Sequence, residues 1–165
     1  MLTDLLPDLT TAYPVNRLAL DAANLYWTET DGTLGKVMKM VIATGSSSPL
    51  ASNQAGAYGL TVDTTTVYWT NRTSAGSVMK VPKTGGVAPT TLASGQNLPT
   101  GIVVDASYAY WANSGSGTVM RVPLAGGTLP AIIGKDFTTP TEIAVDATSV
   151  YVLTGNGSIT KITPK

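Results

Sequence analysis

The chain has 165 residues, which is the length of one ordinary domain. Its ten acidic and ten basic residues cancel, and charged residues make up 12% of the chain, against a usual share of roughly 25%. This balance argues against binding to nucleic acid or to an anionic membrane surface, because both call for clustered Lys and Arg. The sequence contains no Cys and no His, which removes disulfides, thiol chemistry and the usual zinc ligands.

The first ten residues, MLTDLLPDLT, lack the basic region of a signal peptide. No apolar run approaches the ~18 residues that a membrane span needs. We therefore expect a soluble protein, while its compartment stays unknown. Residues 3–9 read as a strand whose sheet lies elsewhere in the chain.

A ten-residue motif then occurs four times along the chain. Its copies are LDAANLYWTE (20–29), VDTTTVYWTN (62–71), VDASYAYWAN (104–113) and VDATSVYVLT (145–154). Each contains an Asp followed five residues later by a Tyr. The first three copies continue with Trp, and the fourth has Val152 instead. Two further positions recur in all four copies, one occupied by Gly and one by a basic residue. We call the set of equivalent basic residues the basic row; it consists of Lys39, Lys80, Arg121 and Lys161. Such self-similarity at a period of about 42 residues indicates a repeat architecture.

Each copy predicts four short strands. In the third copy these are residues 101–105, 108–113, 118–123 and 129–133, rich in β-branched and aromatic residues and separated by Gly, Asn and Ser turns. Four antiparallel strands per repeat are typical of a β-propeller blade. We predict an all-β propeller with blades at about 15–54, 57–95, 99–134 and 140–165, the last completed by residues 3–9.

The motif resembles the YWTD repeat of lipoprotein-receptor-type propellers in the stretches YWTE (26–29), YWTN (68–71) and YWAN (110–113). The strand entry GIVVD (101–105) is similar to NHL-type propellers and to lactonase and streptogramin-lyase propellers. The resemblance implies the propeller fold and leaves the activity open, because propellers host both binders and enzymes. Glu29, Asn71 and Asn113 stand where the YWTD family has its Asp.

The repeated residues have a structural interpretation. We predict that the Tyr-Trp pairs fill the interfaces between neighbouring blades and that each Asp accepts N–H groups of its own turn. A calcium ring of the four aspartates is the less favoured alternative, so we expect no metal and no cofactor. For the basic row we expect stems that cover a blade face and heads that reach water, with anion binding as the alternative.

Two closures follow from four blades. One chain can form a four-bladed ring with residues 3–9 completing its own blade 4, or two chains can exchange those strands in an eight-bladed ring with two-fold symmetry. Of these two closures we favour the eight-bladed homodimer. A fragment of a longer propeller is a third alternative. Arg17 and Glu142 occupy equivalent places in blades 1 and 4, and we predict that they face each other where these blades meet.

The loops that connect successive blades differ from copy to copy, which makes their end of the ring the candidate ligand site. Aromatic, amide and charged residues there suit a glycan or a peptide, by stacking and hydrogen bonding. Ordinary solvated loops are the alternative. We predict a non-enzymatic binding or scaffold propeller; a divergent or partial lactonase- or lyase-type enzyme is the alternative. The candidate ligand-binding residues are Tyr13, Arg17, Asn53, Tyr58, Asn97, Phe137 and Glu142.

Overall fold

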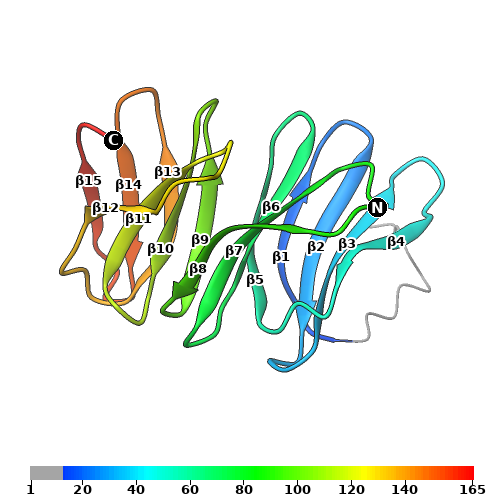
Figure 1. Ribbon diagram of the computed structural model, residues 1–165, viewed down its shortest axis with the longest axis horizontal. Coiled ribbons are helices and arrows are strands. Elements are labelled where there is room, and N and C mark those ends of the chain that lie inside the picture. The colour runs from blue at the N-terminus through cyan, green and yellow to red at the C-terminus, as the bar shows by residue number, and fades with distance from the viewer. Residues whose placement is uncertain (1–12) are drawn as a thin grey trace, which may run out of the picture.

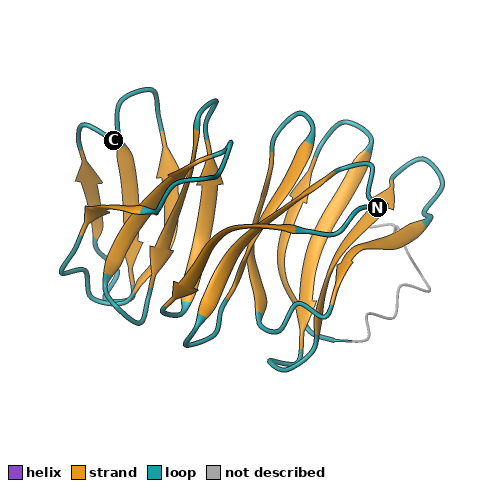
Figure 2. Ribbon diagram, viewed as in Figure 1, coloured by secondary structure: helices purple, strands orange, loops and turns teal. Residues whose placement is uncertain are grey.

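Four antiparallel sheets follow one another along the chain in a computed structural model that describes residues 13–165. Blade 1 contains β1 (Val15–Leu20), β2 (Asn24–Thr30), β3 (Gly35–Val41) and β4 (Ser47–Ser52), and blade 2 contains β5 (Ala57–Val62), β6 (Thr66–Asn71), β7 (Gly76–Pro82) and β8 (Thr90–Gln96). Blade 3 contains β9 (Pro99–Val104), β10 (Tyr108–Asn113), β11 (Thr118–Pro123) and β12 (Ala131–Gly134), and blade 4 contains β13 (Pro140–Val145), β14 (Val150–Thr154) and β15 (Ile159–Ile162). The described residues contain strands and loops without a helix (Figure 2), and accordingly none that could span a membrane.

The blades stand side by side in chain order, with blade 1 and blade 4 at opposite ends (Figure 1). Each is a simple meander, so every strand pairs with its neighbour in sequence. The first strands pack in succession, β1 on β5, β5 on β9 and β9 on β13. The prediction of an all-β propeller of four blades is confirmed. The strand proposed to complete blade 4, residues 3–9, lies outside the described residues.

The core consists of three apolar clusters, one at each joint between neighbouring blades. Each cluster combines the Tyr of one blade with the Trp of the next, or with Val152 at the joint between blades 3 and 4. The prediction that the Tyr-Trp pairs fill the interfaces is therefore confirmed. The two faces of a sheet alternate along each strand, so Tyr and Trp, adjacent in sequence, serve opposite joints. The pairs are Tyr26 with Trp69, Tyr68 with Trp111 and Tyr110 with Val152.

Each Asp of the motif organises the turn between the first two strands of its blade. In blade 2, Asp63 Oδ1 accepts the backbone N–H groups of Thr65 and Thr66 at 2.7 and 2.8 Å. Its second oxygen, Oδ2, accepts the hydroxyl of Tyr68 at 2.8 Å. The same bonds recur in the other three blades. The carboxylate thus holds the turn and also fixes the Tyr that packs in the joint.

Candidate ligand-binding site at the loop face

The candidate site begins with four equivalent positions on the first strands of the blades. Arg17 and Glu142 occupy this position in blades 1 and 4, and Gly59 and Gly101 occupy it in blades 2 and 3. A Cβ atom added at Gly59 would lie 2.1 Å from the Thr100 carbonyl oxygen, and one at Gly101 would lie 2.8 Å from Glu142 Cα. The two glycines therefore allow the first strands to converge at this level, which a side chain would prevent.

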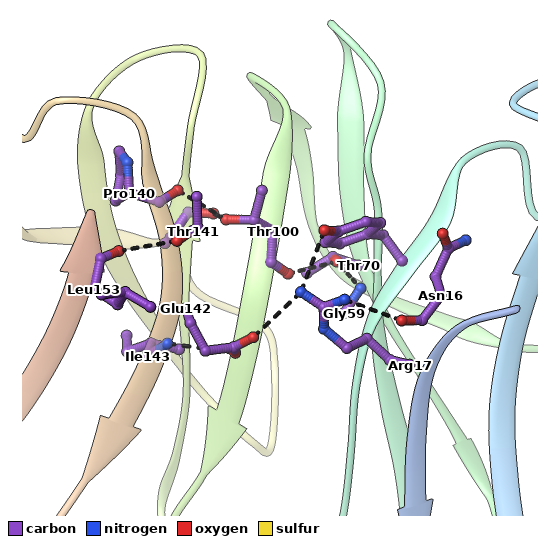
Figure 3. Close-up of polar contacts among 12 residues, drawn as sticks. Asn16, Arg17, Gly59, Thr70, Thr100, Pro140, Thr141, Glu142, Ile143 and Leu153 are labelled. Carbon is purple, nitrogen blue, oxygen red and sulfur yellow. Dashed lines mark hydrogen bonds and ion pairs between the residues drawn. The ribbon is translucent and has the colours of Figure 1, made fainter. Parts of the chain in front are cut away.

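Arg17 and Glu142 meet over these glycines. Figure 3 shows the two side chains pointing toward each other, with the strands of blades 2 and 3 between them. Arg17 Nη2 lies 3.4 Å from Glu142 Oε2, and the two side chains are 36% and 46% exposed. The predicted pairing of these residues forms, but it spans two blades instead of a closed joint between blades 4 and 1. Among the described residues, β13 and β1 do not pack together as the other first strands do.

Tyr58 extends this ion pair into a cluster of aromatic and charged groups. Its hydroxyl accepts a hydrogen bond from Arg17 Nη2 at 3.2 Å, and the Arg17 guanidinium lies 4.6 Å from the centroid of its ring. The guanidinium of Arg72, from the loop between β6 and β7, lies 5.2 Å from the same centroid. Cations within about 6 Å of an aromatic face are attracted to it. We call Arg17, Tyr58, Arg72 and Glu142 the Arg-Tyr cluster.

The remaining predicted residues lie apart from this cluster. Tyr13 is half-buried, with Lys36 Nζ 5.9 Å from its ring centroid. Asn53 and Asn97 are exposed in the loops that enter β5 and β9. Phe137 is half-buried and packs against the apolar cluster between blades 3 and 4. Three of the seven predicted residues, Arg17, Tyr58 and Glu142, are thus brought together.

Arg72 joins the cluster although the sequence reasoning passed over it. It directly follows Asn71 at the end of the YWTN stretch, where the repeat offers a basic residue in no other blade. That departure from the repeat was the available signal. The fold was needed to show that the turn after β6 and the start of β5 meet at one end of the same blade.

Gln54, in the loop before β5, and Gln96, at the end of β8, serve the fold. The side-chain oxygen of Gln54 accepts hydrogen bonds from Trp69 Nε1 at 3.2 Å and from Asn71 Nδ2 at 3.0 Å. Gln96 does the same for Trp111 and Asn113, one blade further on. In blade 1 the carboxylate of Glu29 accepts the N–H of Trp27 at 3.1 Å. The residues in the YWTD-Asp position therefore belong to a hydrogen-bond system around each Trp.

The lysines of the basic row bind the next blade. Lys39 Nζ donates to the Lys83 carbonyl at 3.0 Å, and Lys80 Nζ donates to the Leu124 carbonyl at 2.6 Å. The heads of Lys39 and Lys80 are thus bonded to the following blade, which the expectation of heads that reach water did not include. A long side chain at this position can span the joint between two blades. The hydrogen bond from its ammonium group to the backbone carbonyl then takes the place of a hydrogen bond to water.

A second hollow lies at the opposite end of the blades, among the turns that the Asp row organises. It is an open cavity of about 1070 Å³, and its wall includes Asp21, Asp63, Asp105, Lys39 and Lys83. These groups already have partners: Asp21 Oδ2, for example, lies 2.8 Å from Lys83 Nζ. Within residues 13–165, no three His, Cys, Asp or Glu side chains are arranged to hold a metal ion.

The turn carboxylates are held in their ionised form. The hydrogen bond from Lys83 and the turn N–H of Ala23 hold the pKa of Asp21 well below its usual range. Burial disfavours the charge of Asp105, but hydrogen bonds from Lys165 and the turn outweigh it and lower its pKa to about 2. Burial, reinforced by hydrogen bonds to Asp63 and Asp105, raises the pKa of Tyr68 and of Tyr110 to about 12. These shifts arise from structural bonds and do not create an acid or base near neutral pH.

Solved structures of propellers resemble this chain in fold. No protein-family model matches the sequence, and no curated protein matches it. A chain from the crystal structure of a nidogen/laminin complex, a YWTD β-propeller, superposes with a TM-score of 0.80 at 16% identity, covering 91% of this chain and 59% of that one.

Two further propellers extend this comparison. The computationally designed Ika4 protein superposes with a TM-score of 0.76 at 14% identity, covering 100% of both chains. Streptogramin B lyase, a lactonase-like propeller, gives 0.64 at 13% identity, covering 90% of this chain and 53% of that one. The chain thus spans about three-fifths of the nidogen/laminin chain and half of the lyase. These neighbours include YWTD and lactonase-like propellers, and the fold of this chain is that of a β-propeller.

Proposed function

We propose that this propeller is a non-enzymatic binding scaffold that holds a glycan or a peptide at the Arg-Tyr cluster. The observation that carries the proposal is the convergence of an aromatic ring, two guanidinium groups and a carboxylate at one half-exposed place on the loop face. Aromatic faces stack on sugar rings and apolar side chains, and guanidinium groups bind carboxylates and carbonyls. The propeller provides a fixed frame for these groups.

The hydrogen-bonding capacity of the cluster supports this function. Arg17 donates to Tyr58, to Glu142 and to the Asn16 carbonyl, the last through Nη1 at 2.9 Å. These bonds hold its guanidinium over the Tyr58 ring before a ligand arrives. Arg72 is an exposed residue in the turn after β6, where its guanidinium can take an acceptor of the ligand. A preorganised cluster loses less side-chain entropy on binding than a flexible one.

Screening a glycan array and a peptide library with the intact chain tests the proposal, with affinity then measured by calorimetry. We expect Arg72→Ala to weaken binding by about 10–100-fold, as for the loss of a charge-assisted hydrogen bond. Arg121→Ala is the matched control, because the Arg121 guanidinium also lies over a Tyr ring, 4.9 Å from the centroid of Tyr108, in blade 3. Absence of any ligand in both screens, or equal effects of the two variants, would contradict the proposal.

An enzymatic role is the second candidate, and the similarity in fold to streptogramin B lyase is the observation that favours it. The chain has no His, so its acid–base residues would be carboxylates such as Glu142, which sits in the cluster. Incubation with a panel of lactones and cyclic esters tests this role by product formation. Turnover that Glu142→Gln abolishes would replace the binding proposal by the enzymatic one.

A further inference from the structure

Within residues 13–165, each of the two end blades has one apolar face on which no other blade packs. On blade 4 this face carries Tyr151 and Leu153 from β14 and Ile159 from β15, which cross-strand pairing places side by side. Ile159 is 73% exposed and Leu153 is 39% exposed. Together with Glu142, Ile143 and Ala144 they line an apolar groove of about 180 Å³. We call this the leading face of blade 4.

The repeat shows what covers such a face in the rest of the molecule. The equivalents of Ile159 in the first three blades are Val37, Val78 and Val119, and all three are fully buried. Each packs in one cluster with an aliphatic residue from the first strand of the following blade, namely Leu60, Ile102 and Ile143. The leading face of blade 4 is therefore shaped for the corresponding face of another blade of the same repeat.

Blade 1 presents that corresponding face. Leu18 on β1 is equivalent to Leu60, Ile102 and Ile143, and it is 63% exposed; Leu20, two residues further on the same side, is 70% exposed. Trp27 and Met40, on the neighbouring strands, are already buried, so the uncovered part of this face is formed by β1. We call it the trailing face of blade 1. Leu18 and Leu20 are left in solvent although their equivalents are at least half-buried.

We propose that the trailing face of blade 1 docks on the leading face of blade 4 of a second copy of this chain. The chain's own blade 1 does not cover blade 4: within the described residues β1 and β13 lack the packing that joins the other first strands, and both faces are exposed. Two copies have two leading and two trailing faces, so two identical joints leave neither face uncovered. The result is a ring of eight blades with two-fold symmetry.

Two further observations support this assembly. The chain superposes on parts of longer single-chain propellers, covering 59% and 53% of their lengths, so its arc of four blades fits within a larger ring of the same fold. Each end face also exposes large apolar side chains, Ile159 and Leu153 on blade 4 and Leu18 and Leu20 on blade 1, and exposed apolar patches of this kind mark association sites. The inference concerns the ends of the arc and does not depend on a ligand at the Arg-Tyr cluster.

Sedimentation equilibrium with the 165-residue chain tests the inference. We expect a species of twice the 17.0 kDa chain mass. Ile159→Lys on the leading face and Leu18→Glu on the trailing face should each weaken the dimer by about 100-fold or more, because each leaves an unpaired charge in a desolvated joint. Leu129→Lys is the control: this side chain is 92% exposed and lies between β11 and β12, away from both faces.

Mixing the two variants gives a stricter test. In a ring of one Ile159→Lys chain and one Leu18→Glu chain, one joint is wholly native and the other places opposite charges together. The equimolar mixture should therefore recover dimer that neither variant forms alone. A wild-type chain that stays at the mass of one chain with a native circular dichroism spectrum would overturn the inference. Failure of the mixture to recover dimer would also overturn it.

Discussion

Among single side chains, the motif Asp fixes both a turn and a neighbouring side chain. One carboxylate accepts two turn N–H groups and the hydroxyl of the Tyr five residues later, as Asp63 does with Thr65, Thr66 and Tyr68. These three contacts recur in every blade and explain why Asp and Tyr return together, because the Asp holds in place the Tyr hydroxyl of its own blade.

Truncation of Trp69 should destabilise the protein strongly. Its side chain is fully buried in the joint between blades 1 and 2, and its Nε1 donates to Asn71 at 3.1 Å and to Gln54. We expect Trp69→Ala to lower the free energy of unfolding by about 3–5 kcal/mol, measured by urea denaturation. Trp69→Phe keeps most of the packing and should cost less. A loss below about 1 kcal/mol for the Ala variant would show that the joint is not packed as described.

The stability of the fold should fall in acid. Because Asp105 and Asp146 have pKa values lowered to about 2, the folded state binds fewer protons than the unfolded state, whose Asp pKa is about 3.9. For Asp146 the main cause is the turn N–H of Thr148, followed by the hydroxyl of Tyr151. Their stabilising contribution is complete above about pH 5 and is lost as the pH falls toward 2. Urea denaturation between pH 2 and 6 measures this loss.

Asp105→Asn is the matched variant for the acid prediction. It removes one titrating carboxylate and the ion pair with Lys165, in which the two charged atoms lie 2.7 Å apart. Its free energy of unfolding should be lower than that of the wild type at pH 6, and the difference should shrink toward pH 2. A pH profile parallel to that of the wild type would show that Asp105 does not contribute to the acid dependence.

At the level of strands and sheets, the periodic rows made the architecture predictable from sequence. The Tyr-Trp rows revealed four blades and their joints because each copy must bury the same positions against a neighbour. The bonds between side chains of different blades could not be predicted. Lys39 donates to the following blade and Gln54 accepts from it, and the length of a side chain does not show which partner it will find.

The same limit applies to the candidate site. Arg17, Tyr58 and Glu142 were predicted because the segments that connect the blades depart from the repeat; the structure places them on the first strands β1, β5 and β13 and brings them together. Phe137 was predicted on the same grounds, as an aromatic residue in a segment that departs from the repeat, yet it packs against the core at the joint of blades 3 and 4. In that joint Val152 replaces the large Trp of the other blades, and the loop aromatic fills space near it. Composition alone does not distinguish these two uses of an aromatic residue.

Blade 4 should be the first sheet to open. Its joint with blade 3 contains Val152 in place of Trp, and Ile159 on its other side is exposed. Amide hydrogens of β14 should therefore exchange faster than those of β6 and β10, as expected for a unit with less buried apolar surface. Native-state hydrogen exchange followed by mass spectrometry measures this difference. Equal protection of the three strands would contradict it. The same measurement on the Ile159→Lys variant, in which the proposed joint with a second copy is disrupted, separates local opening of blade 4 from protection by that second copy.

Across the assembled chain, curvature depends on how closely the first strands approach one another. Thr70 Oγ1 donates to the Thr100 carbonyl at 2.8 Å, and Thr100 Oγ1 donates to the Pro140 carbonyl at 3.0 Å (Figure 3). These bonds join blade 2 to blade 3 and blade 3 to blade 4, beside Gly59 and Gly101. The threonines thus attach the strands at the level where the glycines remove steric hindrance. The Arg17–Glu142 pair then spans the four blades over the same level.

Adding a methyl group at Gly59 should disrupt this arrangement. The new Cβ would lie 2.1 Å from the Thr100 carbonyl oxygen and 2.9 Å from Thr70 Oγ1, so β5 and β9 must separate and the bond between Thr70 and Thr100 must lengthen. We expect Gly59→Ala to lower the free energy of unfolding by about 1–3 kcal/mol, the usual cost of overpacking. Gly155→Ala is the control, since its Cβ would approach no atom closer than 3.3 Å.

The ion pair offers a readout that separates a change in curvature from a general loss of stability. In the wild type, Arg17 and Glu142 are about one-third to one-half exposed, so their coupling in a double-mutant cycle with Arg17→Gln and Glu142→Gln should be about 0–1 kcal/mol and should weaken with salt. In the Gly59→Ala background the ends of the arc move apart, and the coupling should fall to zero. An unchanged coupling in that background would mean that the glycines do not set the distance between blades 1 and 4.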